Sequence, residues 1–234
     1  MSPLPLVDPG PGKKRCSWIT ANSEPVYVAF HNEEWGVPVH DDRKLFELLT
    51  LSQALAELTW PVILSKREEF RVMIDGFYDA SLCEFTDKKM NQLSKSNGST
   101  LLSEQKMRAV ITNAKQIRKV ADEFGSFSNY CWSFVNHRPV TNGFRYPHQV
   151  PSKTPKSEAM SKDLMRRGFR CVGPTTIYSF MQVAGIVNDH LPCCFRFDQV
   201  CCQAKADEKD LRAERRLSSS SSEYFRDQDT EVCN

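Results

Sequence analysis

The stretch SEQKMRAVITNAKQIRKVADEFG, residues 103–125, decides the fold class. Its apolar residues recur every three or four positions, which is the spacing of one face of an α-helix. Those residues are Met107, Val110, Ile111, Ala114, Ile117 and Val120. Ser103 is a candidate helix cap, and Gly125 stands where a helix commonly stops. The pattern therefore predicts a long helix between these two residues.

The segments on either side show helical spacing too, and none shows the sustained alternation of strands. Helices are predicted within residues 41–60, 61–74, 126–136, 156–169 and 173–189. Pro61 and Pro174 suit the first turns of their helices, and Ser157 is a candidate cap for the helix within 156–169. We find no internal repeat. The expected fold is all-α, a compact array of short helices.

The composition is that of an ordinary globular protein, with 40% hydrophobic and 26% charged residues among 234. Residues 1–14 are rich in proline and glycine and predict a flexible arm. Residues 203–234 are polar, with a run of five serines and too few apolar residues for a core, so we expect a disordered tail. One folded domain is predicted over residues 15–202.

Several classes of protein are disfavoured. No apolar run approaches the roughly 20 residues that span a bilayer, and the N-terminus lacks the order of a secretory signal, so an intracellular protein is expected without a defined compartment. The nine cysteines are then better interpreted as thiols or metal ligands than as disulfides. Residues 205–234 hold six Lys/Arg and eight Asp/Glu, which leaves 25 minus 21, or +4, on residues 1–204. That charge permits a nucleic-acid partner without requiring one.

The stretch NDHLPCCF, residues 188–195, places His190 four residues before Cys194. Such a pair is half of a tetrahedral zinc site. Cys16 and His31, near the other end of the domain, could supply the second half and close a site with no open position. On spacing alone, the alternative of buried thiols and a hydrogen-bonded core histidine stays open.

Six blocks occur in order: RCSW, YVAFHNEEWGVP, LTW, WSFVNH, RGFRCVGPTTIYSFMQVAGIVNDH and a terminal cysteine pair. Together, over about residues 15–195, they resemble the DNA-3-methyladenine glycosylase I (Tag) family of helix-hairpin-helix repair enzymes. The resemblance implies an all-α fold and a structural zinc ion bound by Cys16, His31, His190 and Cys194. It also implies hydrolysis of the N-glycosidic bond of 3-methyladenine in double-stranded, alkylated DNA, as in base excision repair.

The resemblance further implies a base pocket of aromatic side chains. The matching positions are Trp18, Tyr27, Phe30, Trp35 and Trp60. A 3-methylated adenine is cationic as a nucleoside, and aromatic faces attract flat cations. The alternative is that these rings form ordinary core.

The sequence departs from the family at two pocket positions. Ser52 stands where the family usually has a glutamate that reads the base, and Phe30 stands where a tyrosine is usual. Glu57 lies five residues after Ser52, about 140° around a helix, and is expected on the rim instead. Ser52 therefore marks the catalytic position, and the alternative function is a damage-binding homologue with weak or no catalysis.

Contacts with DNA are expected at two places. Leu58 is a candidate wedge that fills the gap left by a flipped base, with ordinary core packing as the alternative. The family's hairpin falls within residues 94–116, where backbone amides can bind phosphate. No lysine stands out as a Schiff-base nucleophile, so a monofunctional enzyme is expected, and a monomer is the default. A zinc-clipped interaction protein without DNA binding is the third alternative.

Overall fold

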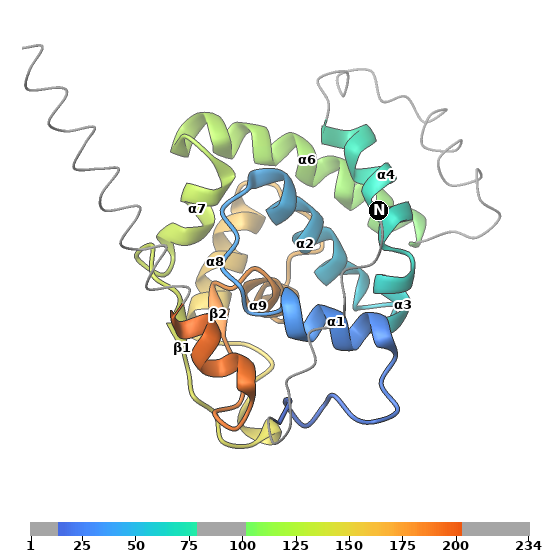
Figure 1. Ribbon diagram of the computed structural model, residues 1–234. Coiled ribbons are helices and arrows are strands. Elements are labelled where there is room, and N and C mark those ends of the chain that lie inside the picture. Colours follow the sequence, from blue (N-terminus) through green and yellow to red (C-terminus); the bar gives the residue numbers. More distant parts are fainter. Residues whose placement is uncertain (1–13, 79–101, 203–234) are drawn as a thin grey trace, which may run out of the picture.

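The computed structural model describes residues 14–78 and 102–202, and the expected all-α fold is correct (Figure 1). The helices are α1 (Pro25–Glu33), α2 (Asp42–Ala54), α3 (Trp60–Ser65), α4 (Arg67–Tyr78), α6 (Glu104–Phe124), α7 (Phe127–Ser133), α8 (Pro155–Arg166) and α9 (Pro174–Val183), with a 3-10 turn η2 (Pro147–Gln149). Residues 195–202 are also helical. None of the described helices is long and apolar enough to cross a membrane. The predicted arm up to residue 13 and the tail from residue 203 lie outside the described residues.

The core is built around α2 and α9, which pack against each other near the centre of the array (Figure 1). Ten consecutive residues of α2, from Leu45 to Ala54, are buried. A helix buried on all sides needs neighbours all round, and α4, α6, α7 and α9 supply them. The amphipathic α6 contributes the apolar face that its sequence pattern predicts, including Val110, Ile117 and Val120.

Both ends of α6 lie where the sequence predicts them, but the hydrogen bonds at its N-terminus differ from those expected. Gly125 follows the helix with φ +82°, the left-handed conformation that glycine adopts readily. Ser103 occupies the N-cap position, but its hydroxyl does not cap the helix. It donates to Glu57 Oε1 at 2.6 Å, while its backbone N–H donates to Glu57 Oε2 at 3.1 Å. The carboxylate of the α2–α3 loop therefore meets the start of α6.

Two local predictions were wrong, and one helix was missed. The segment 61–74 is two helices, α3 and α4, separated at Lys66. The cap of α8 is Thr154, whose hydroxyl accepts from the Ser157 backbone N–H while the Ser157 hydroxyl binds back to Thr154. Pro155 at the first helical position was the missed signal, since proline is favoured there. Helix α1 was not predicted.

A short parallel pair of strands, β1 (Val140–Thr141) and β2 (Val187–Asn188), joins two loops, although no strand was expected. Close beside it, Gly185 has φ +66°, and a Cβ there would lie 2.2 Å from the carbonyl carbon of Val37. The loop after α1 can therefore lie directly on the segment after α9. Val39 N–H donates to Ala184 O at 3.1 Å across this contact.

Candidate functional site

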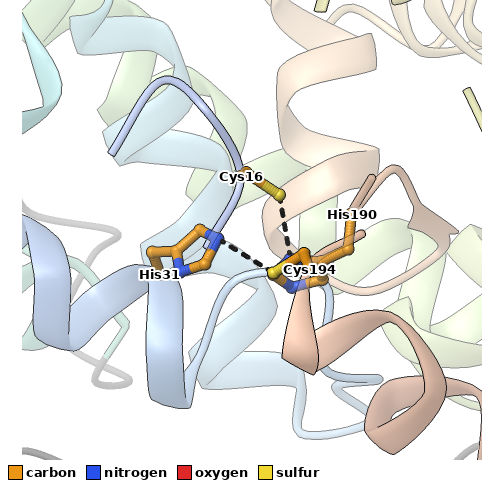
Figure 2. A group of neighbouring side chains, drawn as sticks. All are labelled: Cys16, His31, His190 and Cys194. Atoms are coloured by element: carbon orange, nitrogen blue, oxygen red, sulfur yellow. Dashed lines mark hydrogen bonds between the residues drawn. The ribbon is translucent and has the colours of Figure 1, made fainter. Parts of the chain in front are cut away.

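Four side chains from the two ends of the domain converge in a buried cluster (Figure 2). Cys16 comes from the segment before α1, His31 from the last turn of α1, and His190 and Cys194 from the segment after β2. Their potential ligand atoms all lie within 4.8 Å of one another. The sequence-based prediction that these four residues meet is confirmed.

Three sulfur–nitrogen distances in the cluster fit the spacing around one tetrahedral metal ion. Cys194 Sγ lies 3.7 Å from His31 Nε2 and 3.6 Å from His190 Nδ1, and Cys16 Sγ lies 3.5 Å from His190 Nδ1. Metal bonds of about 2.3 Å to sulfur and about 2.05 Å to nitrogen, at the tetrahedral angle, require sulfur and nitrogen to be about 3.6 Å apart. The cluster is therefore a candidate metal site whose geometry suits a small tetrahedral cation.

Hydrogen bonds fix which ring nitrogen of each histidine faces the cluster. The Nε2 atom of His190 lies 2.8 Å from the backbone carbonyl oxygen of Trp35, a pure acceptor, so Nε2 carries the proton and Nδ1 keeps its lone pair. His31 Nδ1 lies 3.0 Å from Asn32 Oδ1, which leaves Nε2 for the cluster. Hydrogen bonds of the ring nitrogen that faces away from the metal orient the rings of metal-binding histidines.

Protonation also favours a cation. Burial lowers the pKa of His190, which keeps its ring neutral, as a metal ligand must be. The hydrogen bond between the two cysteines lowers the pKa of Cys194, against the opposing effect of burial, and raises the pKa of Cys16. The two thiol groups thus share one proton, and a bound cation would replace it.

The backbone around the cluster holds the two chain segments together. Phe195 N–H donates to Lys14 O at 2.9 Å, and Leu191 N–H donates to Cys16 Sγ at 3.3 Å. Gly36, with φ +81°, passes the His190 ring so closely that a Cβ would lie 3.1 Å from its Cδ2 atom. These contacts align the start of the described chain with residues 190–195 independently of any ion.

An aromatic cavity of about 330 Å³ lies next to this cluster. Its lining residues are Trp18, Tyr27, Trp35, Trp60, Pro147, Val150 and Gln182. Four of the five aromatic residues that the sequence places in a pocket thus line one cavity. The fifth, Phe30, is buried behind them, and its ring centroid lies 5.0 Å from that of Trp60. A volume of this size matches the lower end of the range for small-molecule pockets.

Two tryptophans connect the cavity with the cluster. Trp35 packs edge-on against the His190 ring, with centroids 4.6 Å apart, and against Trp18 with centroids 5.4 Å apart. Trp18 in turn meets the His31 ring at 6.4 Å. The two walls of the cavity are therefore packed directly on the histidines of the candidate metal site.

Ser52 is almost fully buried in α2, and it is not among the residues that line the cavity. Its hydroxyl donates to Leu48 O of the preceding turn at 2.8 Å. The donor is therefore already used within the helix. Glu57 is exposed and binds Ser103, which lowers its pKa through the hydrogen bond from that hydroxyl. Glu57 is not among the residues that line the cavity.

Leu58 follows Glu57 in the loop between α2 and α3 and is half-buried against the main core. Lys106 Nζ donates to Gln53 O at 2.5 Å and so ties the last turn of α2 to α6. Of the predicted hairpin within residues 94–116, residues 94–101 lie outside the described part of the chain. The rest belongs mainly to α6, whose start is occupied by the Glu57 carboxylate.

Sequence reasoning missed three of the residues that line the cavity. Pro147 and Val150 come from the loop around η2, and Gln182 comes from the end of α9. Behind Gln182 lies the Asp189 carboxylate, which is fully buried. The available signal in the sequence was the acidic residue Asp189 directly before the candidate ligand His190.

Comparison with known proteins shows which family this chain is similar to. The model of the methyladenine glycosylase family matches residues 18–197. The chain is 36% identical over 184 residues to DNA-3-methyladenine glycosylase 1 of Escherichia coli, covering 78% of this chain and 97% of that protein. It is 37% identical over 180 residues to the DNA-3-methyladenine glycosylase of Haemophilus influenzae, covering 77% and 96%.

A solved structure shows the same fold. The 3-methyladenine DNA glycosylase I (TAG) of Staphylococcus aureus, described in terms of 3-methyladenine recognition, superimposes with a TM-score of 0.72 at 30% identity. That match covers 78% of this chain and 96% of the other. With a family model spanning most of the described residues and relatives above 30% identity matched almost over their full length, the chain belongs to the methyladenine glycosylase family.

Proposed function

We propose that this protein is a monofunctional DNA glycosylase that hydrolyses the N-glycosidic bond of 3-methyladenine in double-stranded, alkylated DNA. The observation that carries the proposal is the aromatic cavity between Trp18, Trp35 and Trp60 in a chain whose curated relatives are named for this activity. DNA as the substrate implies an intracellular protein acting in base excision repair, and the expected state is a monomer.

The chemistry suits such a cavity. A glycosylase extrudes its target nucleotide from the duplex and holds the base in a pocket. The 3-methylated base is cationic in the nucleoside, so indole and phenol faces at Trp18, Tyr27 and Trp60 attract it. Phe30 supports Trp60 from behind. The base leaves without needing a proton, a cation-like sugar forms, and water adds to it. The main task of the enzyme is then to bind this transition state.

The metal ion that fits the cluster is zinc, and its role is structural. Two cysteine sulfurs and two histidine nitrogens at tetrahedral spacing are a preferred zinc ligand set. Cys16, His31, His190 and Cys194 would fill all four positions, which leaves none for substrate or water. The ion would fasten the two ends of the domain and, through Trp18 and Trp35, steady the cavity walls.

Strand cleavage is not expected from this site. Lyase activity requires an amine that forms a Schiff base with the sugar. Among the described residues that line the cavity there is no lysine. Leu58, half-buried beside the cavity residue Trp60, remains the proposed wedge that enters the duplex. Nicking of the abasic strand by the purified protein would contradict a monofunctional mechanism.

A second candidate is a damage-binding homologue with weak or no turnover. Ser52 favours it, because the family's glutamate is replaced by a hydroxyl already bonded to Leu48 O. A neutral serine cannot attract a cationic base as a carboxylate does. This candidate keeps the fold, the metal and the cavity, and differs only in the rate of base release.

Release of free 3-methyladenine from methylated duplex DNA decides between the two. The native protein would be assayed beside Ser52→Glu, with Trp60→Ala as the variant of the cavity wall. Release far above the uncatalysed rate, reduced in Trp60→Ala, supports the enzyme. No release by the native protein, with tight binding of damaged DNA and release by Ser52→Glu, supports the second candidate. A protein that neither binds nor cleaves methylated DNA would refute both, and would favour the third alternative of a zinc-clipped interaction protein.

A further inference from the structure

The polar wall of the aromatic cavity is formed by Gln182 at the end of α9. Its side-chain amide nitrogen donates to Asp189 Oδ2 at 2.9 Å. Gln182 is half-buried, so one side of the amide faces the protein and the other is accessible from the cavity. The orientation of this amide determines what the cavity presents to a bound base.

Asp189 fixes that orientation. Its carboxylate is fully buried and accepts two further hydrogen bonds, from the Tyr178 hydroxyl at 2.5 Å and from Asn142 Nδ2 at 2.8 Å. With these three donors, both oxygens of the carboxylate serve as acceptors. Only the nitrogen of the Gln182 amide can face it, because the amide oxygen would meet another acceptor. Gln182 Oε1 therefore points away from Asp189, and no described residue donates to it.

We propose that Gln182 Oε1 is the acceptor that recognises the exocyclic amino group of the base, and that Asp189 is the positioning residue that holds it. The inference rests on the proposed glycosylase function and specifies its substrate class, 6-aminopurines methylated at N3. The amino group at C6 of 3-methyladenine donates hydrogen bonds. A keto oxygen at the same place, as in guanine or hypoxanthine, would face Gln182 Oε1 with acceptor against acceptor.

Charge adds to this selection. A divalent ion bound by two thiolates and two neutral histidines carries no net charge, so the neighbouring metal site would not cancel Asp189. Among the described residues, none of the ion pairs includes Asp189. Its negative charge therefore lies one hydrogen bond behind the cavity wall. A cationic base is attracted there, which offsets part of what the Ser52 position no longer supplies.

The test is the binding of two free bases, followed by quenching of tryptophan fluorescence from the cavity walls. The bases are 3-methyladenine and 3-methylhypoxanthine, which differ in having an amino or a keto group at C6. The native protein is expected to bind 3-methyladenine at least about 10-fold more tightly, the scale of one buried hydrogen bond to a well-placed acceptor. In Gln182→Met, of similar length but without the amide oxygen, the ratio is expected to fall to about 3-fold or less.

Asp189→Asn is the second variant, because an asparagine can donate to the Gln182 oxygen and so release the fixed orientation. It is expected to lower the same ratio while keeping the metal. Gln116→Met, the same substitution on α6 away from the cavity, is the matched control and is expected to keep the native ratio. Metal content and melting temperature are measured for each variant, so that a folding defect is seen separately from lost discrimination.

The outcomes separate this inference from the proposed function. If the native protein releases 3-methyladenine from DNA but Gln182→Met and Asp189→Asn both keep the native ratio, the inference is wrong and the glycosylase function stands. The inference is also wrong, and the glycosylase function stands, if the native protein excises the base but binds the two free bases equally tightly. If the native protein binds neither base and releases none, the proposed function itself fails.

Discussion

Loss of one ligand of the metal cluster is expected to destabilise the whole domain. The perturbation is Cys194→Ser, which removes a ligand that lies 163 residues from its partner His31. In the chain-entropy model, a crosslink that closes a loop of this length restricts the unfolded chain by about 5 kcal/mol at 25 °C. That amount equals the lower end of the total stability of ordinary domains.

The expected shift is large enough to measure directly. For a domain of this size, each kcal/mol corresponds to roughly 2–4 °C, so the melting temperature should fall by about 10–20 °C. Thermal unfolding would be followed by circular dichroism, with the metal content of each sample measured by elemental analysis. The native protein treated with a strong zinc chelator should melt near the temperature of Cys194→Ser, and the chelator should leave the variant unchanged.

Cys193→Ser is the matched control. Cys193 is the exposed neighbour of Cys194 and lies outside the cluster. Its substitution should leave the metal in place and shift the melting temperature by no more than about 2 °C, as for other surface changes. The reasoning would be refuted if the metal-loaded native protein, Cys193→Ser and Cys194→Ser all melted at the same temperature.

Three further predictions concern other parts of the molecule. Trp60→Ala should lower kcat/KM for 3-methyladenine release by about 5- to 150-fold at unchanged metal content, because one base–aromatic stack is lost. An unchanged kcat/KM would show that Trp60 does not contact the base. Asp42→Ala should lower the free energy of unfolding, measured in urea, by about 2 kcal/mol. The reason is that the Asp42 carboxylate accepts hydrogen bonds from the backbone N–H groups of Phe127 and Ser128 at the start of α7. A change below about 0.5 kcal/mol would show that these hydrogen bonds do not stabilise the fold. Burial opposes the charge on Glu34, but hydrogen bonds from Arg67 outweigh it and lower the pKa of Glu34 to about 2. Because the folded pKa is depressed, its stabilisation is complete above about pH 4.5 and is lost as the pH falls towards 2. Glu34→Gln should make acid unfolding less steep in that range, and an identical acid transition would show that the pair with Arg67 contributes nothing.

Local signals in the sequence predicted the long helix and the four clustered ligands. The apolar face of α6 has six residues at helical spacing between Met107 and Val120, and a pattern of that length indicates an α-helix. Cys16, His31, His190 and Cys194 were identified because metal ligands are restricted to few residue types. The spacing of His190 and Cys194 and the positions of Cys16 and His31 made them candidates, and the resemblance to the family decided against the alternative of buried thiols and a core histidine.

Other features depend on contacts that a linear pattern does not contain. Helix α1 has no clear apolar face, since Val26 is exposed while the polar His31 and Asn32 are buried. Tertiary packing and the ligand cluster therefore decide its structure. The same holds for Gln182 and Asp189, whose hydrogen bond joins a helix end to the segment after a two-residue strand. Ser52 was singled out by its departure from the family, but only coordinates reveal that its hydroxyl is used within α2.

The position of the cluster also affects how the protein is made. A ribosome delivers the chain from its N-terminus at about 5–20 residues per second, so roughly 10–30 s separate the appearance of His31 from that of Cys194. During that interval the nascent chain exposes half of a metal site and the aromatic residues around it. Capture of the ion is confined to the last stage of synthesis, when the segment after α9 emerges. If the site binds zinc, as proposed, cells short of the ion at that moment would release a complete polypeptide whose two ends lack the metal crosslink and are held by backbone contacts such as that between Phe195 and Lys14.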